Sequence, residues 1–447
     1  MKMSAREFRK SIMLLLKVVI FAALVGSFTF IWINFYEEAA FVRKGNYLTI
    51  LLYAALLLVF SYIYGSFKIG ASRLGEVTYS LSLAIVFTNV ITYIQLSLVA
   101  SALLEISIIL ALTFIQIFIA IVFCYFANMI YFILYPSRQI IAVYSDVQTS
   151  KEFMRKISKV HEKYVLKSAI HSETPYDEII AEIDKYYCVL ICDVNPELRD
   201  RLITYCCEKE KRVYILPSIT DIMINNALTT QVFDTPMFLS KNKGLSVEQL
   251  IIKRTIDIIL SVLAAIIFSP ALIVIPICIK LCDRGPVFFR QERVTKDNKI
   301  FSVVKFRSMR VDAEKDGAQK AVDNDDRITS VGKVIRFLRL DELPQIINIL
   351  QGDMSIVGPR PERIENVEEY TGLIPEFPLR HKVKAGLTGY AQVYGKYNTS
   401  PKDKLAMDLL YIQKYSVLSD LKLIFLTVKI LFLSESTEGF EDKKNDK

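Results

Sequence analysis

The sequence has little glycine, little proline and few histidines, and its cysteines follow no regular spacing. With 16 Gly and 14 Pro in 447 residues, 52% of them hydrophobic, the chain is neither collagen-like nor disordered. The 7 cysteines do not form a disulfide framework, so reduced thiols facing a cytoplasm are expected. The net charge of +8 comes with no nucleic-acid recognition motif. This basic excess is compatible with an anionic membrane surface or with phosphate-bearing substrates.

Long hydrophobic runs are what the sequence does contain. The mean hydropathy of +0.34 is high for a soluble protein. Four apolar stretches fill the first third of the chain, at Ile12–Ile33, Tyr47–Phe67, Val77–Val99 and Ala102–Leu134. Each reaches the ~20 residues that a helix needs to cross a bilayer. The sequence therefore predicts a four-helix transmembrane domain over residues 1–136.

The loop charges indicate how these spans are oriented. Basic residues precede the first span, separate the second from the third and follow the fourth: Lys2, Arg6, Arg9, Lys10, Lys68, Arg73 and Arg138. The opposite loops contain only Arg43 and Lys44, diluted by Glu37 and Glu38. Because cytoplasmic loops are enriched in Lys and Arg, we expect the N-terminus and everything after Arg138 to be cytoplasmic.

Three uncharged polar residues lie within the spans, namely Asn89, Gln95 and Gln116. One interpretation is a transport path, but transporters place charged groups near the bilayer midplane and these spans have no such groups. Hydrogen bonds between neighbouring helices explain the three residues better.

Residues 137–240 show a different pattern, in which short apolar runs alternate with helical stretches. The expected strands are 140–144, 164–170, 188–192 and 213–216, and the expected helices are 151–160, 176–184 and 197–209. Such alternation predicts a small α/β, Rossmann-like domain with a doubly wound parallel sheet. The turn Ser145–Thr149 contains no glycine, which a phosphate-binding turn needs. A regulatory or oligomerising role is therefore favoured over nucleotide binding.

Four cysteines of this domain could suggest a metal site: Cys188, Cys192, Cys206 and Cys207. The first pair falls on an expected buried strand with no histidine nearby, so we interpret the four as core thiols. The three histidines of the chain, His161, His171 and His381, are assigned packing or surface positions and no catalytic role.

A further apolar run covers residues 256–281, with basic residues at both ends. Lys253 and Arg254 precede it, and Lys280 and Arg284 follow it, which argues that both ends are cytoplasmic. Ser269-Pro270 interrupts the run, because proline removes an amide donor and bends or breaks a helix. An ordinary fifth span with a tolerated kink is the alternative. A re-entrant helical hairpin, which enters the inner leaflet and returns, fits the charges and the break together.

The chain then becomes polar and rich in short motifs. In order they are GPVFFRQER (285–293), KFRSM (305–309), LDELPQ (340–345), GDMSIVGPRP (352–361) and GLTGYAQ (386–392). In the third motif, Pro344 is tolerated only in the first turn of a helix, so Asp341 and Glu342 lie at a helix N-terminus. Adjacent carboxylates there point in different directions, which suits one nucleophile and one ligand of a divalent cation such as Mg²⁺. Taken alone, the pair could equally be an N-cap aspartate beside a solvated glutamate.

Cations that could bind a diphosphate accompany this pair, namely Lys305, Arg307, Arg336, Arg339 and Arg360. The flanking residues Pro359 and Pro361 restrict the backbone on both sides of Arg360. Near the C-terminus, Leu421–Leu433 is too short to span a membrane and reads as an interfacial amphipathic helix. A charged tail follows at residues 438–447.

At these motifs the sequence resembles the bacterial sugar transferase family, the polyprenyl-phosphate hexose-1-phosphate transferases or monotopic phosphoglycosyl transferases. The resemblance covers about Val247–Leu433, and the N-terminal helices with the α/β domain resemble the long, dimer-forming members. It implies a membrane α-helical bundle, a cytoplasmic α/β domain and an α-rich catalytic domain over 247–437 with a re-entrant membrane helix, in the bacterial inner membrane. It also implies transfer of a sugar 1-phosphate from a UDP-sugar to undecaprenyl phosphate, with release of UMP, initiating O-antigen, capsule or exopolysaccharide synthesis.

The resemblance assigns roles to individual residues. Asp341 would attack the β-phosphate and form a covalent phosphosugar intermediate, and Glu342 would bind Mg²⁺. Lys305, Arg336 and Arg360 match family positions that hold phosphates. Asp408 matches another acidic position, and Ser269-Pro270 matches the break of the re-entrant helix. Ala385 and Phe337-Leu338 depart from the usual family residues without touching the nucleophile.

Two other functions remain open at this point. A membrane glycosyltransferase would pass on the sugar alone and release UDP, and a non-enzymatic membrane scaffold would release nothing. The residues do not identify the sugar. We expect a homodimer, contact with inner-leaflet lipid and no nucleic-acid partner.

Overall fold

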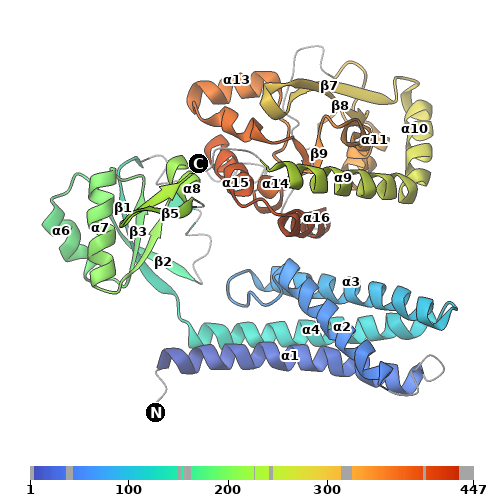
Figure 1. The fold of residues 1–447 in the computed structure, drawn as a ribbon, viewed down its shortest axis with the longest axis horizontal. Coiled ribbons are helices and arrows are strands. Elements are labelled where there is room, and N and C mark those ends of the chain that lie inside the picture. Colours follow the sequence, from blue (N-terminus) through green and yellow to red (C-terminus); the bar gives the residue numbers. More distant parts are fainter. Residues whose placement is uncertain are drawn as a thin grey trace. The chain divides into compact units, whose positions relative to one another are not determined.

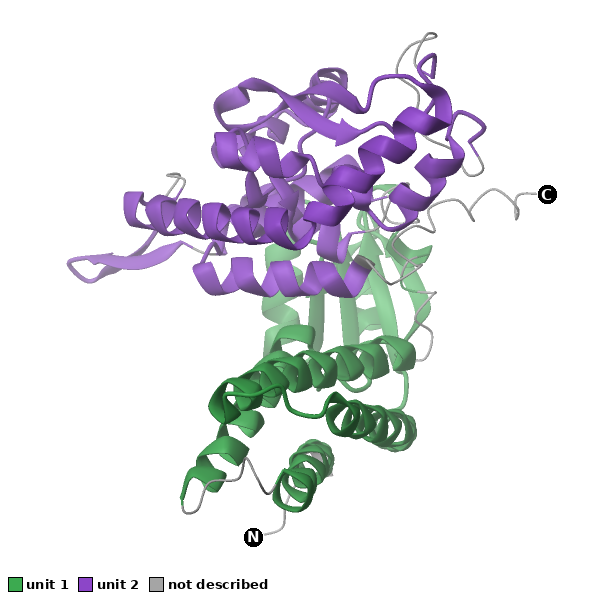
Figure 2. Cartoon of the chain, turned by 90° about the vertical axis from the view of Figure 1, so that its right-hand side faces the viewer, with its two compact units in different colours: residues 1–218 green, residues 219–447 purple. Residues whose placement is uncertain are grey.

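A computed structural model of the chain describes residues 5–36, 44–147, 153–155, 157, 163–225, 227–240, 245–313, 325–395 and 399–431. The chain divides into two compact units, Met1–Ser218 and Ile219–Lys447 (Figure 2). The first unit contains a helical bundle and an α/β sheet, and the second contains all the polar motifs.

The bundle consists of α1 (Ala5–Phe35), α2 (Gly45–Tyr64), α3 (Leu74–Ala100) and α4 (Ile106–Leu134). Each of these helices is long and apolar enough to cross a membrane, as the sequence predicts. Their shared core contains Phe28 stacked on Tyr53, with ring centroids 3.9 Å apart. Large apolar side chains such as Leu14 and Phe118 are exposed on the outside of the bundle, as expected where lipid covers a helix.

A polar network lies in the centre of this apolar bundle. The Gln116 amide nitrogen donates to the Leu24 carbonyl oxygen (3.0 Å), and its Oε1 accepts from Asn89 Nδ2 (2.9 Å). The Tyr53 hydroxyl donates to Asn89 Oδ1 (3.0 Å), and Asn89 Nδ2 also donates to Thr113 Oγ1 (2.8 Å). These bonds connect all four helices, which confirms the helix–helix interpretation of Asn89 and Gln116.

We expect Gln116→Leu to destabilise the bundle by about 1–2 kcal/mol, because it removes a residue that hydrogen-bonds to three other helices. Reversible unfolding in detergent would measure the loss. Thr29→Val is the control, because the Thr29 hydroxyl donates only to the Val25 carbonyl of its own helix. An equal loss in both variants would show that the network adds nothing specific.

The α/β part contains β1 (Arg138–Tyr144), β2 (Tyr164–His171), α6 (Tyr176–Ile183), β3 (Cys188–Cys192), α7 (Pro196–Glu208) and β4 (Arg212–Ile215). In the four-stranded sheet, of which β1, β2 and β3 are labelled in Figure 1, every neighbouring pair is parallel and the order is β2-β1-β3-β4. One face of β1 and β3 packs against α6 and α7, and the opposite face forms a second core cluster. The expected strands and two of the expected helices are confirmed, and most of the expected helix 151–160 lies outside the described residues.

The cysteine interpretation is confirmed at three positions and wrong at one. Cys188, Cys192 and Cys206 are buried, and burial raises the pKa of each thiol. Cys207 is exposed, because α7 turns it away from the sheet that covers its neighbour. In the described part of the chain, no group of three or more His, Cys, Asp or Glu side chains could hold a metal ion.

The boundary after the α/β sheet differs from the one expected near residue 240. Residues from Ile219 onward group with the second unit, namely α8 (Ile219–Ile224) and the hairpin of β5 (Leu228–Val232) and β6 (Thr235–Leu239). The reason is packing, because Ile222 is buried in a cluster with Phe377, Leu405 and Leu409.

After the β5–β6 hairpin, the second unit continues with α9 (Val247–Ile267) and α10 (Ser269–Asp283), which meet at an angle of 61°. Pro270 lies in the first turn of α10, where a helix tolerates proline, so the bend falls at Phe268. The remaining elements are β7 (Phe288–Val294), β8 (Ile300–Phe306), α11 (Ser330–Phe337), α12 (Gln345–Gln351), β9 (Ser355–Val357), α13 (Ile364–Leu373), β10 (Gly386–Thr388), α14 (Tyr390–Tyr394), α15 (Pro401–Gln413) and α16 (Val417–Leu431). β7 and β8 form an antiparallel hairpin, and β9 pairs with β10 in parallel.

Candidate active site

Asp341 and Glu342 lie in a 3₁₀ turn, Leu340–Glu342, between α11 and α12. The turn begins after Arg339, whose φ of 56° is left-handed, and Pro344 caps α12. The two carboxylates therefore precede the helix by one turn. The expected helix N-terminus is confirmed in position, although the local structure is a 3₁₀ turn.

Glu342 is the centre of a charged cluster. Its side chain is 14% exposed, and its Oε1 accepts from Lys305 Nζ at 2.7 Å and from an Arg360 guanidinium nitrogen at 3.0 Å. Burial opposes ionisation of this carboxyl, but the Arg360 and Lys305 charges outweigh it and hold the pKa of Glu342 well below its usual range. Glu342 is therefore an anion between two cations.

Asp341 has the opposite environment. Burial and the neighbouring Glu342 charge raise the pKa of Asp341, and Lys305, Arg336 and Arg339 offset this only in part. The fold thus pushes the pKa values of two adjacent carboxyls apart, which is typical of paired groups with separate tasks. Asp341 is poorly solvated beside three cations, which suits a nucleophile that attacks an anionic phosphate.

The segment Pro359-Arg360-Pro361, called the PRP loop below, follows β9 after one residue, Gly358. The Gly386 amide donates to the Pro359 carbonyl oxygen (2.9 Å), and the Gly358 amide donates to the Thr388 carbonyl oxygen (2.8 Å). A Cβ on Gly358 would lie 2.4 Å from the Lys384 carbonyl oxygen, so only glycine fits immediately before the loop. These contacts place Arg360 beside Glu342.

Arg307 is not part of this cluster, contrary to the sequence-based expectation. Its side chain is 6% exposed and forms an ion pair with Asp283 at the end of α10. It also donates to the Pro286 carbonyl oxygen at 2.6 Å. Arg307 is therefore committed to holding the end of α10 against the β7–β8 hairpin, and little of its surface remains to meet a ligand.

The other expected residues are placed as follows. Arg336 contributes to the field at Asp341 from α11. Ser269 and Pro270 lie at the α9–α10 bend, where the Ser269 hydroxyl donates to the Ile266 carbonyl oxygen (2.8 Å). Asp408 is buried on α15 and pairs with Arg380 rather than with the cluster around Glu342.

Sequence reasoning missed Arg293, Glu362 and Arg380. Arg293 donates to the Pro361 carbonyl oxygen (3.1 Å), and Arg380 donates to the Arg360 carbonyl oxygen (2.9 Å), so both hold the PRP loop. Glu362 lies 3.7 Å from both Arg380 and Lys404. Arg293 falls within the motif 285–293, which was its only signal in the sequence.

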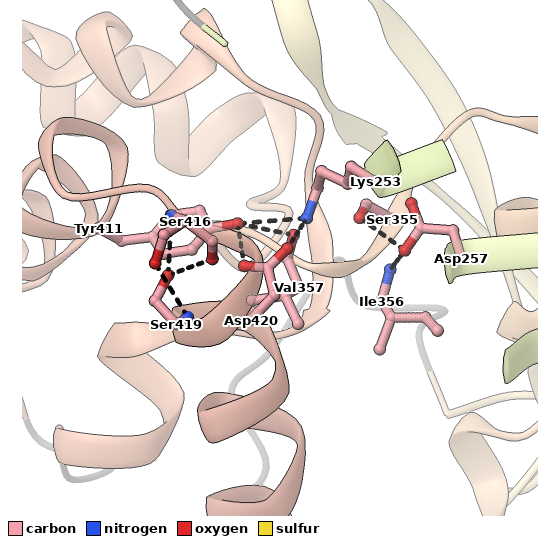
Figure 3. Close-up of polar contacts among 9 residues, drawn as sticks. All are labelled: Lys253, Asp257, Ser355, Ile356, Val357, Tyr411, Ser416, Ser419 and Asp420. Atoms are coloured by element: carbon pink, nitrogen blue, oxygen red, sulfur yellow. Dashed lines mark hydrogen bonds and ion pairs between the residues drawn. The ribbon is translucent and has the colours of Figure 1, made fainter. Parts of the chain in front are cut away.

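The first turns of α9 hold the elements that carry the site (Figure 3). The Asp257 carboxylate accepts from the Ser355 hydroxyl and the Ile356 amide of β9, both at 3.0 Å. Lys253 pairs with Asp420 of α16 (2.6 Å) and donates to the Tyr411 hydroxyl (3.2 Å). Arg254 donates to the carbonyl oxygens of Ile349 and Leu350 at the C-terminus of α12, at 2.5 and 2.6 Å. One helix thus anchors both α12, which follows Asp341 and Glu342, and β9, which precedes Arg360.

His381 has a structural role with a measurable pH dependence. Its Nδ1 lies 2.6 Å from Asn298 Oδ1, and burial together with the nearby Arg380 charge lowers its pKa to about 4. The neutral ring therefore donates to Asn298, and protonation favours the unfolded chain.

The neutral His381 ring stabilises the folded protein. This contribution to the free energy of unfolding is complete above pH 6.5 and is lost as the pH falls through about 4. We expect the difference in unfolding free energy between wild type and His381→Gln to shrink by about 2 kcal/mol between pH 7 and pH 5. Chemical unfolding of both proteins at the two pH values checks this. Parallel pH profiles would contradict it.

Comparison with known proteins gives a consistent result for the second unit. The family model described as "Bacterial sugar transferase" matches residues 248–434. A UDP-glucose:undecaprenyl-phosphate glucose-1-phosphate transferase of Klebsiella pneumoniae is 42% identical over 229 residues, which cover 50% of this chain and 49% of the relative. A UDP-N-acetylgalactosamine-undecaprenyl-phosphate N-acetylgalactosaminephosphotransferase of Aeromonas hydrophila is 45% identical over 183 residues, which cover 40% of this chain and 43% of the relative.

The chain thus matches about half the length of these two relatives. A shorter relative is matched almost completely. The exopolysaccharide production protein PSS of Rhizobium leguminosarum bv. phaseoli is 39% identical over 199 residues, which cover 42% of this chain and 98% of the relative. A relative of that identity, matched over nearly its whole length, together with the family model over the residues that form the charged cluster, shows that the chain belongs to the bacterial sugar transferase family.

Proposed function

We propose that this protein is an undecaprenyl-phosphate sugar phosphotransferase. It transfers a sugar 1-phosphate from a UDP-sugar to undecaprenyl phosphate and releases UMP, the first step in building an O-antigen, capsule or exopolysaccharide. The observation that carries the proposal is the pairing of a poorly solvated Asp341 with Glu342, which is held by Lys305 and Arg360. Relatives whose names describe this phosphosugar transfer support it.

In the proposed reaction, an Asp341 carboxylate oxygen attacks the β-phosphorus of the UDP-sugar. The new bond joins Asp341 to that phosphorus, and the bond to the bridging oxygen breaks, so UMP leaves with the electron pair. An oxygen of undecaprenyl phosphate then attacks the same phosphorus and displaces the Asp341 carboxylate. Lys305, Arg336 and Arg360 stabilise the negative charge on the transferred phosphoryl group in both steps.

Mg²⁺ is the expected cofactor, with Glu342 as its protein ligand. The described residues contain no cluster of three or more metal-binding side chains, so Glu342 could hold Mg²⁺ only together with ligands from the substrate. Mg²⁺ commonly binds one or two carboxylates together with substrate phosphates. When bound, it would supply charge neutralisation for the diphosphate, while Lys305 and Arg360 keep Glu342 ionised.

We also propose that α9 and α10 form a re-entrant hairpin in the inner leaflet of the bacterial inner membrane. The 61° bend and the basic residues at both ends support this arrangement. The catalytic unit then faces the cytoplasm, where a UDP-sugar and a membrane-embedded lipid phosphate can meet. α16 would lie at the interface, and the α/β domain, Rossmann-like in this proposal, would serve regulation or assembly of a homodimer.

Thiol labelling tests this topology in intact cells, in a variant whose other six cysteines are replaced so that Cys282, at the end of α10, is the only one left. A membrane-impermeant reagent should not label Cys282 until the membrane is permeabilised. Ser101→Cys, in the loop between α3 and α4, is the positive control that should react from outside. Labelling of Cys282 in intact cells would identify a fifth crossing instead.

The product of the reaction tests the function. Protein in nanodiscs is given Mg²⁺, undecaprenyl phosphate and a panel of UDP-sugars, and the released nucleotide is identified. UMP with one sugar supports the proposal and identifies the donor. Release of UDP would mean that the protein is a glycosyltransferase, and no release with any donor would favour a scaffold.

A further inference from the structure

Asp408 and Arg380 form an ion pair in the interior of the second unit. Asp408 lies on α15, and Arg380 lies on the 3₁₀ segment Phe377–Lys382. The side chains are 1% and 2% exposed, and an Arg380 guanidinium nitrogen lies 2.7 Å from Asp408 Oδ2. Direct contact with a substrate would require the fold to open around them, so a role for Asp408 must be transmitted by its neighbours.

Arg380 connects this pair to the PRP loop. The guanidinium nitrogen that faces Asp408 also donates to the Arg360 carbonyl oxygen at 2.9 Å. Another nitrogen of Arg380 lies 3.7 Å from Glu362, and the guanidinium lies 5.0 Å from the centroid of the Phe377 ring. Because the Arg360 side chain donates to Glu342, an unbroken series of contacts runs from Asp408 to the Glu342 carboxylate.

The hydrogen bond from Arg380 to the Arg360 carbonyl oxygen limits the backbone rotation that the PRP loop retains. The rings of Pro359 and Pro361 fix their own φ angles, and Pro361 also restricts Arg360 to extended backbone, so few backbone rotations of the loop stay free. The Arg380 hydrogen bond holds the Arg360 carbonyl and so limits the direction in which the Arg360 side chain leaves the backbone. Asp408 in turn holds the Arg380 nitrogen that makes this hydrogen bond. If Asp408 loses its charge, Glu362 is the carboxylate nearest to the buried Arg380 guanidinium and draws it away from the Arg360 carbonyl.

We propose that Asp408 and Arg380 are positioning residues, which act on the reaction only by holding Arg360 against Glu342. The inference rests on the proposed function in one respect, which is that Arg360 contacts the donor phosphate. It assigns Asp408 a task other than binding substrate, metal or lipid.

A double-mutant cycle tests this dependence on Arg360. In the full-length protein, Asp408→Asn should lower kcat/KM for the UDP-sugar about 30- to 100-fold, the size of effect that a small misplacement of a binding group produces. In an Arg360→Gln background the same substitution should change kcat/KM less than about threefold, because the group it positions is already gone. An equal loss in both backgrounds would overturn the proposal.

Arg380→Lys keeps the buried charge and tests the same idea if Asp408→Asn does not fold. Lysine can pair with Asp408, but it lacks the planar fork that reaches the carboxylate and the Arg360 carbonyl together. We expect its activity to fall like that of Asp408→Asn and its melting temperature to stay near the wild-type value. Wild-type activity in Arg380→Lys would overturn the proposal.

Hydrogen–deuterium exchange without substrate separates this inference from the proposed function. Both variants should exchange faster than wild type at residues 358–364, and the β1 peptide 138–144 should not change. Unchanged exchange at 358–364 would overturn the positioning role. If wild type released no UMP with any donor, the proposed function would fail, and the exchange data would still decide the inference.

Discussion

Asp341→Asn is expected to abolish UMP release, with a loss of at least about 10⁴-fold in kcat, as for removal of other enzymatic nucleophiles. An amide does not form the covalent bond to phosphorus that the proposed first step requires. The fold should tolerate the change, because asparagine has nearly the same shape and removes a charge that burial disfavours. We therefore expect the melting temperature to be equal to that of wild type or higher.

Two measurements check this prediction. The first is UMP formation in nanodiscs, and the second is capture of labelled phosphosugar on protein that is denatured after incubation with donor and no acceptor. Wild type should retain label and Asp341→Asn should not. Glu365→Gln, an exposed carboxylate at the start of α13, is the matched control and should behave as wild type. UMP formation by Asp341→Asn within tenfold of wild type would refute the covalent mechanism.

Glu342→Gln is expected to lower kcat/KM about 10²- to 10³-fold, the size of effect seen when one preorganised electrostatic contact is lost. Glu342 is the partner of both Lys305 and Arg360, so its neutral analogue leaves two neighbouring cations without their shared anion. Those cations would no longer be held for the phosphoryl group, and the proposed protein ligand of Mg²⁺ would be lost.

The diagnostic readout for Glu342→Gln is the Mg²⁺ concentration that gives half-maximal activity. We expect it to rise at least about tenfold, because a charged ligand is replaced by a weaker neutral one. In Glu365→Gln it should not change. An unchanged Mg²⁺ requirement in Glu342→Gln, with activity within about threefold of wild type, would show that Glu342 is not the metal ligand.

Local physics accounts for the parts of the fold that could be predicted from the sequence. The four spans of the bundle follow from apolar runs longer than a bilayer is thick, whatever the rest of the chain does. The strand Cys188–Cys192 is buried at every position, as its continuous apolar run predicts. Pro344 and Pro270 mark the starts of helices because proline is tolerated there and disrupts a helix further on.

The residues of the candidate site could be predicted from the sequence, but the contacts between them could not. The adjacent carboxylates Asp341 and Glu342 can be recognised in the sequence, and the short motifs mark Lys305 and Arg360 as candidate phosphate-binding residues. The sequence did not distinguish them from Arg307, which is equally basic and two residues from Lys305, yet is paired with Asp283. It also gave no reason to connect Asp408 with Arg380, or to assign Ile222 to the core of the second unit.

What the sequence by itself determined is the set of membrane helices, the α/β pattern and the identity of the two adjacent carboxylates, because each depends on residues within a few turns of one another. Tertiary structure alone decided which cations meet Glu342, since Lys305 and Arg360 lie 37 and 18 residues away along the chain. It also decided the opposite pKa shifts of Asp341 and Glu342. Burial and charge act through space, so neighbours in the chain can have opposite environments and distant residues can share one.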